Sequence, residues 1–375
     1  MLLTLVWTLA CLAGIDAAIN VAFRYPADPK QQAGSLPTYF EYGRSIEGKL
    51  RRMVGPTDAK SDGLVTAGWP DRVSSAVASP PPGKLGVAVY GMSFSNQIAR
   101  AMQELDPSVA PTMYAGPSAP PNHSYACFVA QNDGGRERNP VQVFAVLASS
   151  VKGLLTLGGS TTTFEKPAPF TFPRYTLGAN GSLTEIRPIV ATVEDLRAAV
   201  ADDAKWTAHI EQLARHDRFY DPLLMTAGPG DRSAVVRMVR RAYAQNESRE
   251  RAAAVGGAEG FRDDPEVGPV LRAMVRDFAK RCRNAGQVPL VLLIQDRPFR
   301  DALHTLLGPT LTADGVAYVS THELAPTTDP SNFLGDGHFT HAVNLKLGQQ
   351  MLEAVRAALA KSKAGETAAR SAGTP

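Results

Sequence analysis

Apolar residues follow three patterns along the chain, and each pattern predicts a different kind of element. Residues 2–23 form an almost unbroken apolar run, and about 20 such residues span a bilayer as a helix. Short apolar runs bounded by Pro or Gly, such as 84–90 (KLGVAVY) and 288–294 (VPLVLLI), predict buried parallel strands. Segments with apolar residues three and four apart, such as 97–105 (QIARAMQEL), predict helices that bury one face.

Strands and helices alternate between residues 84 and 360. The expected strands are 84–90, 112–115, 141–148, 288–294 and 316–319. The expected helices are 97–105, 122–130, 193–213, 232–244, 270–282, 300–307 and 344–360. This alternation predicts an α/β protein with a parallel sheet covered on both faces by helices. Residues 152–188, with a hairpin signal at Asn180-Gly181, are interpreted as a β-rich insertion.

The segments outside the domain 84–360 have other compositions. Residues 24–83 contain a linker rich in Pro, Gln and Gly, a helix at 37–53 and a loop, and so form a juxtamembrane segment. Residues 361–375 are rich in Ala, Ser, Thr and Gly, which predicts a disordered tail. Residues 1–23 are a membrane anchor or a signal segment.

The N-terminal apolar run is compatible with several functions of the segment. Asp16 interrupts it, and no basic residue precedes it, so flanking charge does not fix its orientation. The alternatives are a cleaved signal peptide ending near Asp16-Ala17-Ala18, a buried first helix, and lipid modification of Cys11. We favour an uncleaved anchor in the inner membrane, with the remaining chain outside the cytoplasm, in the periplasm.

Composition narrows the classes of function. The chain has 375 residues, of which 44% are hydrophobic and 20% charged, and its net charge is +3. No basic cluster predicts nucleic-acid binding. The three cysteines lack metal-ligand spacing, and there is no Gly-x-Gly-x-x-Gly or Gly-Lys-Ser/Thr loop. We therefore expect no metal, no nucleotide cofactor and no nucleic-acid partner.

Ser93 lies where a nucleophile is expected in such a fold. It follows the expected strand 84–90 in the turn Gly91-Met92-Ser93 and precedes the helix 97–105. Ligand sites gather at the carboxyl ends of parallel strands, and the N–H groups of a helix N-terminus favour a developing oxyanion. A Ser that merely caps the helix is the alternative.

A second candidate segment, Gly335-Asp336-Gly337-His338, precedes the last expected helix. A serine nucleophile needs a base within hydrogen-bond reach, and the base needs a carboxylate that orients it. His338 and Asp336 fit these roles, with His341 as a rival base. Alternatives are an ordinary loop or a metal site formed with His341, for which the chain supplies no further ligands.

These two segments together resemble the SGNH/GDSL hydrolase superfamily. In that family a nucleophilic Ser follows the first strand and an Asp/His pair precedes the last helix, as Ser93, Asp336 and His338 do here. The resemblance implies a flavodoxin-like three-layer sandwich that hydrolyses or transfers acyl esters. The stretch 39–45 (YFEYGRS) resembles membrane-anchored bacterial relatives associated with cell-surface polysaccharide.

The chain departs from the family pattern at two places. Met92 stands where the family has Asp, and Ser149-Ser150 follows the third strand where the family has an Asn that stabilises the oxyanion. Gly116 matches the family's second block. The resemblance therefore implies an oxyanion hole formed by Ser93, Gly116 and Ser150.

The expected function is that of a serine esterase or O-acyltransferase. The substrate would carry acyl groups, acetyl above all, on an exported or cell-surface polysaccharide, and polysaccharide-biosynthesis proteins are possible partners. The alternative is a non-catalytic scaffold or glycan-binding subunit of a membrane assembly, which the missing Asn favours. The sequence leaves the roles of two further residues undecided. Asp296 either faces the same cleft or forms a salt bridge, and His123 either lines the pocket or lies at the surface.

Overall fold

The computed structural model describes residues 1–26, 31, 33–54, 63–73 and 79–372, and the chain forms two compact units. Unit 1 comprises residues 1–66, 156–171 and 188–252, and unit 2 comprises residues 67–155, 172–187 and 253–375. The chain therefore passes between the units several times, and each unit combines segments that are distant in sequence.

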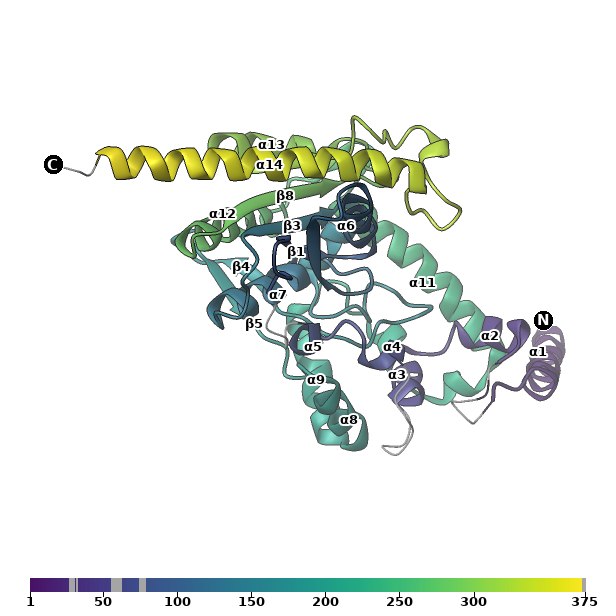
Figure 1. The fold of residues 1–375 in the computed structure, drawn as a ribbon. Coiled ribbons are helices and arrows are strands. Elements are labelled where there is room, and N and C mark those ends of the chain that lie inside the picture. Colours follow the sequence, from purple (N-terminus) through teal and green to yellow (C-terminus); the bar gives the residue numbers. More distant parts are fainter. Residues whose placement is uncertain (27–30, 32, 55–62, 74–78, 373–375) are drawn as a thin grey trace. The chain divides into compact units, whose positions relative to one another are not determined.

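Unit 2 is built on a parallel sheet of five strands (Figure 1). The strands are β1 (Leu85–Gly91), β2 (Val109–Ala115), β3 (Val141–Leu147), β8 (Val288–Ile294) and β9 (Ala317–Ser320). Their order is β2-β1-β3-β8-β9, and every neighbouring pair is parallel. The α/β fold with a flavodoxin-like parallel sheet is therefore confirmed. The strand order reverses between β1 and β3, and open parallel sheets bind ligands at the carboxyl ends of strands at such a point.

Alternate residues of the strands face different layers of helices. The covering helices are α6 (Ser93–Leu105), α7 (Pro121–Asp133), α12 (Gly268–Asn284) and α14 (His341–Ala372). Val87, Val89 and Leu292 lie in one buried cluster with side chains of α6 and α14. On the other face, Tyr90 and Phe144 contact aromatic residues of α7 and α12. The period-two pleat of the strands thus produces the three layers.

Smaller elements complete unit 2. They are α5 (Pro70–Val73), η1 (Ala148–Leu155), α13 (Ala302–Ala313), η3 (Pro330–Asn332), the hairpin of β4 (Arg174–Leu177) with β5 (Leu183–Ile186), and the short pair β6 (Gly256–Gly257) and β7 (Gly260–Phe261). Cys127 and Cys282 are both buried and carry free thiols. Both therefore act as small apolar core residues.

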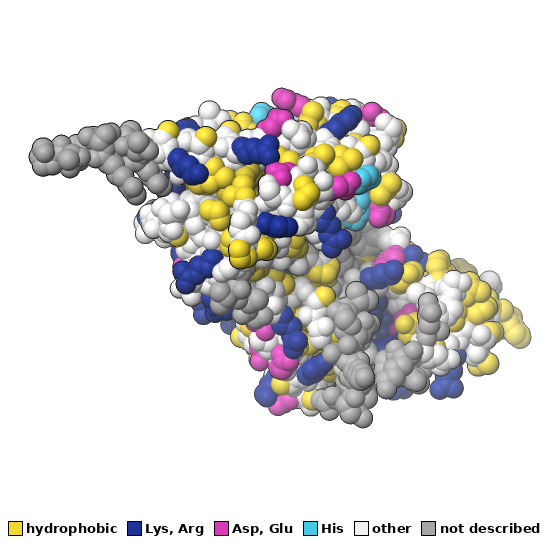
Figure 2. Space-filling model, viewed as in Figure 1, with side chains coloured by type: hydrophobic (Ala, Val, Ile, Leu, Met, Phe, Trp, Pro, Cys, Tyr) yellow, Lys and Arg dark blue, Asp and Glu magenta, His cyan; other side chains and the backbone are white. Residues whose placement is uncertain are grey.

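Unit 1 is helical. Its elements are α1 (Leu2–Ala22), α2 (Ser35–Glu41), α3 (Ile46–Val54), α4 (Gly63–Thr66), α8 (Val193–Ala201), α9 (Asp203–His216), α10 (Pro222–Met225), η2 (Pro229–Arg232) and most of α11 (Ala234–Val255). Helix α1 is long and apolar enough to cross a membrane, and its apolar window is not buried. Figure 2 shows hydrophobic side chains gathered on its surface. An apolar N-terminal helix of this kind is consistent with a signal anchor or a signal peptide.

The structure differs from the sequence-based expectations at several helix boundaries. The expected helix 193–213 is divided because Asp202 accepts hydrogen bonds from the amides of Ala204 and Lys205 and so begins a new helix, α9. The tail was expected to be disordered from residue 361, but α14 continues to Ala372. Ala, Lys, Glu and Arg dominate this stretch, and their high helix propensity extends the helix.

The expected β-rich insertion is mostly irregular. Residues 152–188 begin within η1, and their extended structure is the β4–β5 hairpin, which contains the turn at Asn180-Gly181. Residues 156–171 belong to unit 1 and residues 172–187 to unit 2. The segment is therefore shared by both units instead of forming one insertion.

We expect Gly348→Ala to lower the free energy of unfolding. Alanine in place of glycine normally stabilises a helix by about 1 kcal/mol. Here, however, a Cβ at position 348 would lie 2.8 Å from the backbone nitrogen of Met102 in α6, and such overpacking costs about 1–3 kcal/mol. Urea denaturation checks the sign. Gly257→Ala is the control, because a Cβ there meets nothing within 4 Å. An equal or higher stability of the Gly348→Ala protein would show that α6 and α14 are not in tight contact.

Candidate active site

The turn after β1 presents Ser93 as the first residue of α6. A Cβ at Gly91 would lie 2.3 Å from Ser95 Oγ, so this position requires glycine. Ser95 Oγ accepts a hydrogen bond from the Met92 amide at 2.9 Å and donates one to the Met92 carbonyl at 2.7 Å. Ser95 is fully buried and therefore holds the turn in shape, while Ser93 remains half-buried at its tip.

His338 lies on a tight loop directly before α14. The loop is closed by hydrogen bonds from the Leu334 amide to the His338 carbonyl at 2.7 Å and from the Gly337 amide to the Leu334 carbonyl at 3.0 Å. Gly337 has φ of +89°, a conformation that favours glycine. An isolated bridge between Phe333 and Phe339 fixes the base of the loop. The loop thus has a defined shape that turns Asp336 and His338 toward one another.

The structure brings Ser93, His338 and Asp336 together. Ser93 Oγ lies 2.8 Å from His338 Nε2, although the two residues are 245 positions apart. On the other side of the ring, His338 Nδ1 lies 3.1 Å from Asp336 Oδ2. The order serine, imidazole, carboxylate is the one that general-base activation of a hydroxyl requires.

The contact between Asp336 and His338 is weaker than the contact between Ser93 and His338. His338 Nδ1 is close to Asp336 but is not aligned to form a hydrogen bond. Asp336 is held instead by a hydrogen bond from the His338 amide at 3.1 Å, which lowers the pKa of its carboxyl. Its side chain is 66% exposed, compared with 24% for His338. Solvent therefore screens its attraction for the imidazole.

Phe94 orients the imidazole from the other side. Its ring stacks on that of His338 with the centroids 4.6 Å apart, and it contacts Phe339 edge to face. Arg297, at the carboxyl end of β8, lies over the ring of Phe333 at 4.9 Å. The loop that carries His338 is thus held by aromatic and cation–π contacts. The sequence analysis did not identify Phe94, although its position next to Ser93 and the aromatic residues around His338 point to it.

The rival base His341 lies elsewhere. Its Nε2 is 3.4 Å from a carboxylate oxygen of Glu104, and both side chains are exposed. Within the described ranges, no group of three or more His, Cys, Asp or Glu side chains is placed to hold a metal ion. The structure thus sets His338, and not His341, against Ser93.

Backbone amides near Ser93 are suited to bind an oxyanion. Ser93 and Phe94 occupy the first turn of α6, where amides have no carbonyl partner within the helix. Gly116 directly follows β2, whose end pairs with the end of β1. Ser150 lies in η1, and its hydroxyl donates to the Leu147 carbonyl at 2.8 Å. Because the Ser150 hydroxyl proton is already donated to the Leu147 carbonyl, Ser150 would contact an oxyanion through its backbone amide.

His123 is fully buried, so the alternative that it lies at the surface is wrong. Its Nε2 lies 2.6 Å from the Gly68 carbonyl, and burial lowers the pKa of the imidazole to about 4. A Cβ at Gly116 would lie 2.9 Å from the His123 ring. The neutral ring therefore packs beneath Gly116 and requires a glycine there.

Asp296 follows β8 and supports the end of the sheet. Its carboxylate accepts a hydrogen bond from the Ser149 amide at 2.9 Å. Burial raises the pKa of Asp296, whereas the charge of Lys152 acts in the opposite direction. Burial also lowers the pKa of Lys152. Asp296 thus fixes the segment that follows β3, where the family resemblance places its missing Asn.

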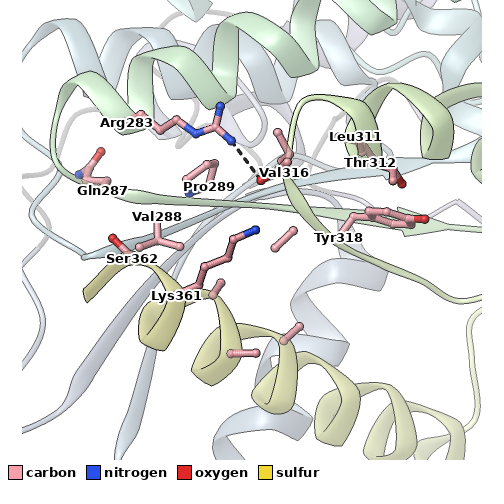
Figure 3. Close-up of a pocket in the computed structure, with 15 residues that line it drawn as sticks. Arg283, Gln287, Val288, Pro289, Leu311, Thr312, Val316, Tyr318, Lys361 and Ser362 are labelled. Carbon is pink, nitrogen blue, oxygen red and sulfur yellow. Dashed lines mark hydrogen bonds between the residues drawn. The ribbon is translucent and has the colours of Figure 1, made fainter. Parts of the chain in front are cut away.

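A cavity of about 680 Å³ lies at the opposite end of the sheet (Figure 3). Val288, Pro289, Ala317 and Tyr318, the first residues of β8 and β9, line it together with residues of α14. Neither Ser93 nor His338 is among its lining residues. The cavity is therefore separate from the candidate active site.

Comparisons with protein-family models, with curated proteins and with solved structures found no match.

We expect Ser95→Ala to destabilise the protein, because it leaves the buried amide and carbonyl of Met92 without this partner. The expected loss is about 1–3 kcal/mol in the free energy of unfolding. Urea denaturation measures it, with Ser182→Ala in an exposed turn as the control. If both substitutions have equally small effects, Ser95 does not hold the turn.

We expect the stability difference between the wild type and Asp296→Asn to depend on pH. Burial raises the pKa of Asp296 in the folded state. The contribution of this carboxyl to the free energy of unfolding is therefore full below its unfolded pKa and is lost as the pH rises through its folded pKa. The free energy of unfolding of the wild type, relative to Asp296→Asn, should therefore fall as the pH rises above about 4, the ordinary pKa of an Asp in an unfolded chain. Asp263→Asn removes the same carboxyl at an exposed position and is the matched control. A pH-independent difference at Asp296 would contradict the assignment.

Proposed function

We propose that unit 2 is a serine esterase or O-acyltransferase of the SGNH/GDSL type, with Ser93 as nucleophile and His338 as general base. The observation that carries the proposal is the distance of 2.8 Å between Ser93 Oγ and His338 Nε2. The position of Ser93 at the carboxyl end of β1, beside the reversal of strand order, supports it.

The proposed chemistry proceeds through an acyl-serine. His338 Nε2 takes the hydroxyl proton as Ser93 Oγ attacks the ester carbonyl carbon, and the first amides of α6 and the Gly116 amide stabilise the oxyanion. The tetrahedral intermediate collapses, the bond to the leaving alkoxide breaks, and His338 donates its proton to that oxygen. Water or a sugar hydroxyl then attacks the acyl-serine by the reverse sequence, which gives hydrolysis or transfer respectively.

The proposed setting is the outer side of the inner membrane. We take α1 to be an uncleaved anchor because its polar residues are bound by the protein. Asp16 accepts hydrogen bonds from Ser233 Oγ at 2.8 Å and from the Val235 amide at 2.9 Å. Cleavage near Asp16 would remove these contacts. With unit 2 in the periplasm, acyl groups on an exported polysaccharide are the proposed substrate, and polysaccharide-biosynthesis proteins are the proposed partners.

A second candidate is a non-catalytic scaffold or glycan-binding subunit of a membrane assembly. The exposure of Asp336 and the poor alignment of its contact with His338 favour it. So does Ser149-Ser150 in place of an Asn donor, since one lost oxyanion donor costs about a hundredfold in rate.

Labelling of the full chain in detergent with a fluorophosphonate probe distinguishes these candidates. We expect covalent labelling that Ser93→Ala abolishes and that His338→Ala slows by about a hundredfold or more, because a general base contributes at least that factor. Asp336→Ala should have a smaller effect, because solvent screens this carboxylate. Ser182→Ala, at an exposed turn, is the matched control and should label normally. A folded protein that fails to label, or labelling that persists in Ser93→Ala, would leave the scaffold as the better account.

A further inference from the structure

A pocket rich in arginine lies at the end of the apolar helix α1, within unit 1. Its volume is about 470 Å³. Its charged lining residues are Arg24, Arg44, Arg52, Arg232 and Arg237, together with Glu41 and Asp231. The lining residues thus include five arginines and two acidic residues, an excess of three positive charges. Asn20 in the last turns of α1 and Phe23 and Tyr25 just after it also line the pocket, which therefore adjoins α1.

The last turns of α1 are docked on unit 1. Asp16, Ile19, Asn20 and Phe23 are partly buried and fall at helical spacing on one face, whereas residues 2–15 are exposed. Besides the contacts of Asp16, Asn20 Oδ1 accepts a hydrogen bond from Arg237 at 3.1 Å. The Phe23 ring stacks on Phe40 of α2 at 5.7 Å. Helix α1 thus has a fixed attachment to α2 and α11.

With α1 as the proposed anchor, on which this inference rests, the attachment brings the pocket to the membrane surface. The undocked part, Leu2–Ile15, has 14 residues, and at about 1.5 Å per residue it spans roughly 21 Å, less than the roughly 30 Å hydrocarbon core. The docked turns must therefore approach the bilayer. Exposed apolar side chains of α2 and α11 suit that environment: Leu36, Tyr39, Val236, Met238 and Val239. Arg241 of α11 lies over the Tyr39 ring at 4.5 Å, so these two helices are neighbours.

The arginines of the pocket are not neutralised by their own carboxylates. Glu41 is shared by Arg44, Arg52 and Arg237, and Arg44 is also 4.0 Å from Asp231. Asp231 is already bonded to Ser45 and Arg240. Arg237 is only 7% exposed, and its Nε has no hydrogen-bond partner. Burial, together with the charge of Arg44, lowers the pKa of both Arg52 and Arg237. An anion in the pocket would relieve this repulsion.

We propose that this pocket binds the phosphate of an anionic membrane lipid headgroup. Guanidinium groups bind phosphate through paired N–H donors, and the pocket combines several of them with a position at the membrane surface. Arg24 and Arg232 are exposed and form no ion pair with the residues that the structure describes, so they provide the free donors. Lipid binding here is independent of the chemistry at Ser93.

The test is calorimetric titration of the full chain, in uncharged detergent, with soluble short-chain phosphatidylglycerol, phosphatidylcholine and inorganic phosphate. We expect phosphatidylglycerol to bind more tightly than phosphatidylcholine. The double substitution Arg24→Gln/Arg232→Gln should weaken phosphatidylglycerol binding at least about tenfold. The matched control is Arg100→Gln/Arg249→Gln, which removes the same charge at exposed positions outside the pocket and should leave binding unchanged. Circular dichroism of each variant checks folding.

Two results would overturn the proposal: equal binding of both lipids, or equal loss in the test and control variants. Phosphate that binds as tightly as phosphatidylglycerol and is equally sensitive to Arg24→Gln/Arg232→Gln would support the anion site but contradict a lipid source. Because Ser93→Ala should bind phosphatidylglycerol normally, failure here is distinguishable from failure of the proposed esterase activity.

Discussion

The packing of α6 against α14 determines the distance between Ser93 and His338 in the candidate site. Ser93 is the first residue of α6, and His338 lies three residues before the first residue of α14. The helices run close together where Gly348 meets the backbone of Met102, and Ile98, Met102, Leu347 and Met351 share one buried cluster above the sheet. The hydrogen bond between Ser93 and His338 thus depends on a helix contact, and the strands beneath fix that contact.

Two kinds of interaction position the imidazole, and they differ in strength. Phe94 stacks on the ring from within the protein, whereas Asp336 approaches from solvent. An exposed carboxylate holds its partner weakly because water screens it. The tilt of His338 is therefore set mainly by aromatic packing. In the proposed enzyme, a bound substrate that excludes water would strengthen the Asp336 contact.

The sequence predicted most of the sheet, because its strands are short apolar runs with clear boundaries at Gly and Pro. The pairing of Ser93 with His338 was predicted from the chemical need of a serine nucleophile for a base and from the resemblance to a family, since no local pattern links residues so far apart. The division into two units was not predicted, because it depends on which apolar faces meet in three dimensions. The same is true of the arginine pocket, whose members come from α1, α2, α3, η2, the start of α11 and adjoining loops.

The most direct test of the activated serine is to trap its acyl intermediate. The full chain is mixed with p-nitrophenyl acetate, quenched in acid, digested and analysed by mass spectrometry. The account predicts one acetyl group on the peptide that contains Ser93, formed in a rapid burst and lost when hydroxylamine is added before the quench. Acetylation confined to lysines, or none at all on a folded protein, would contradict it.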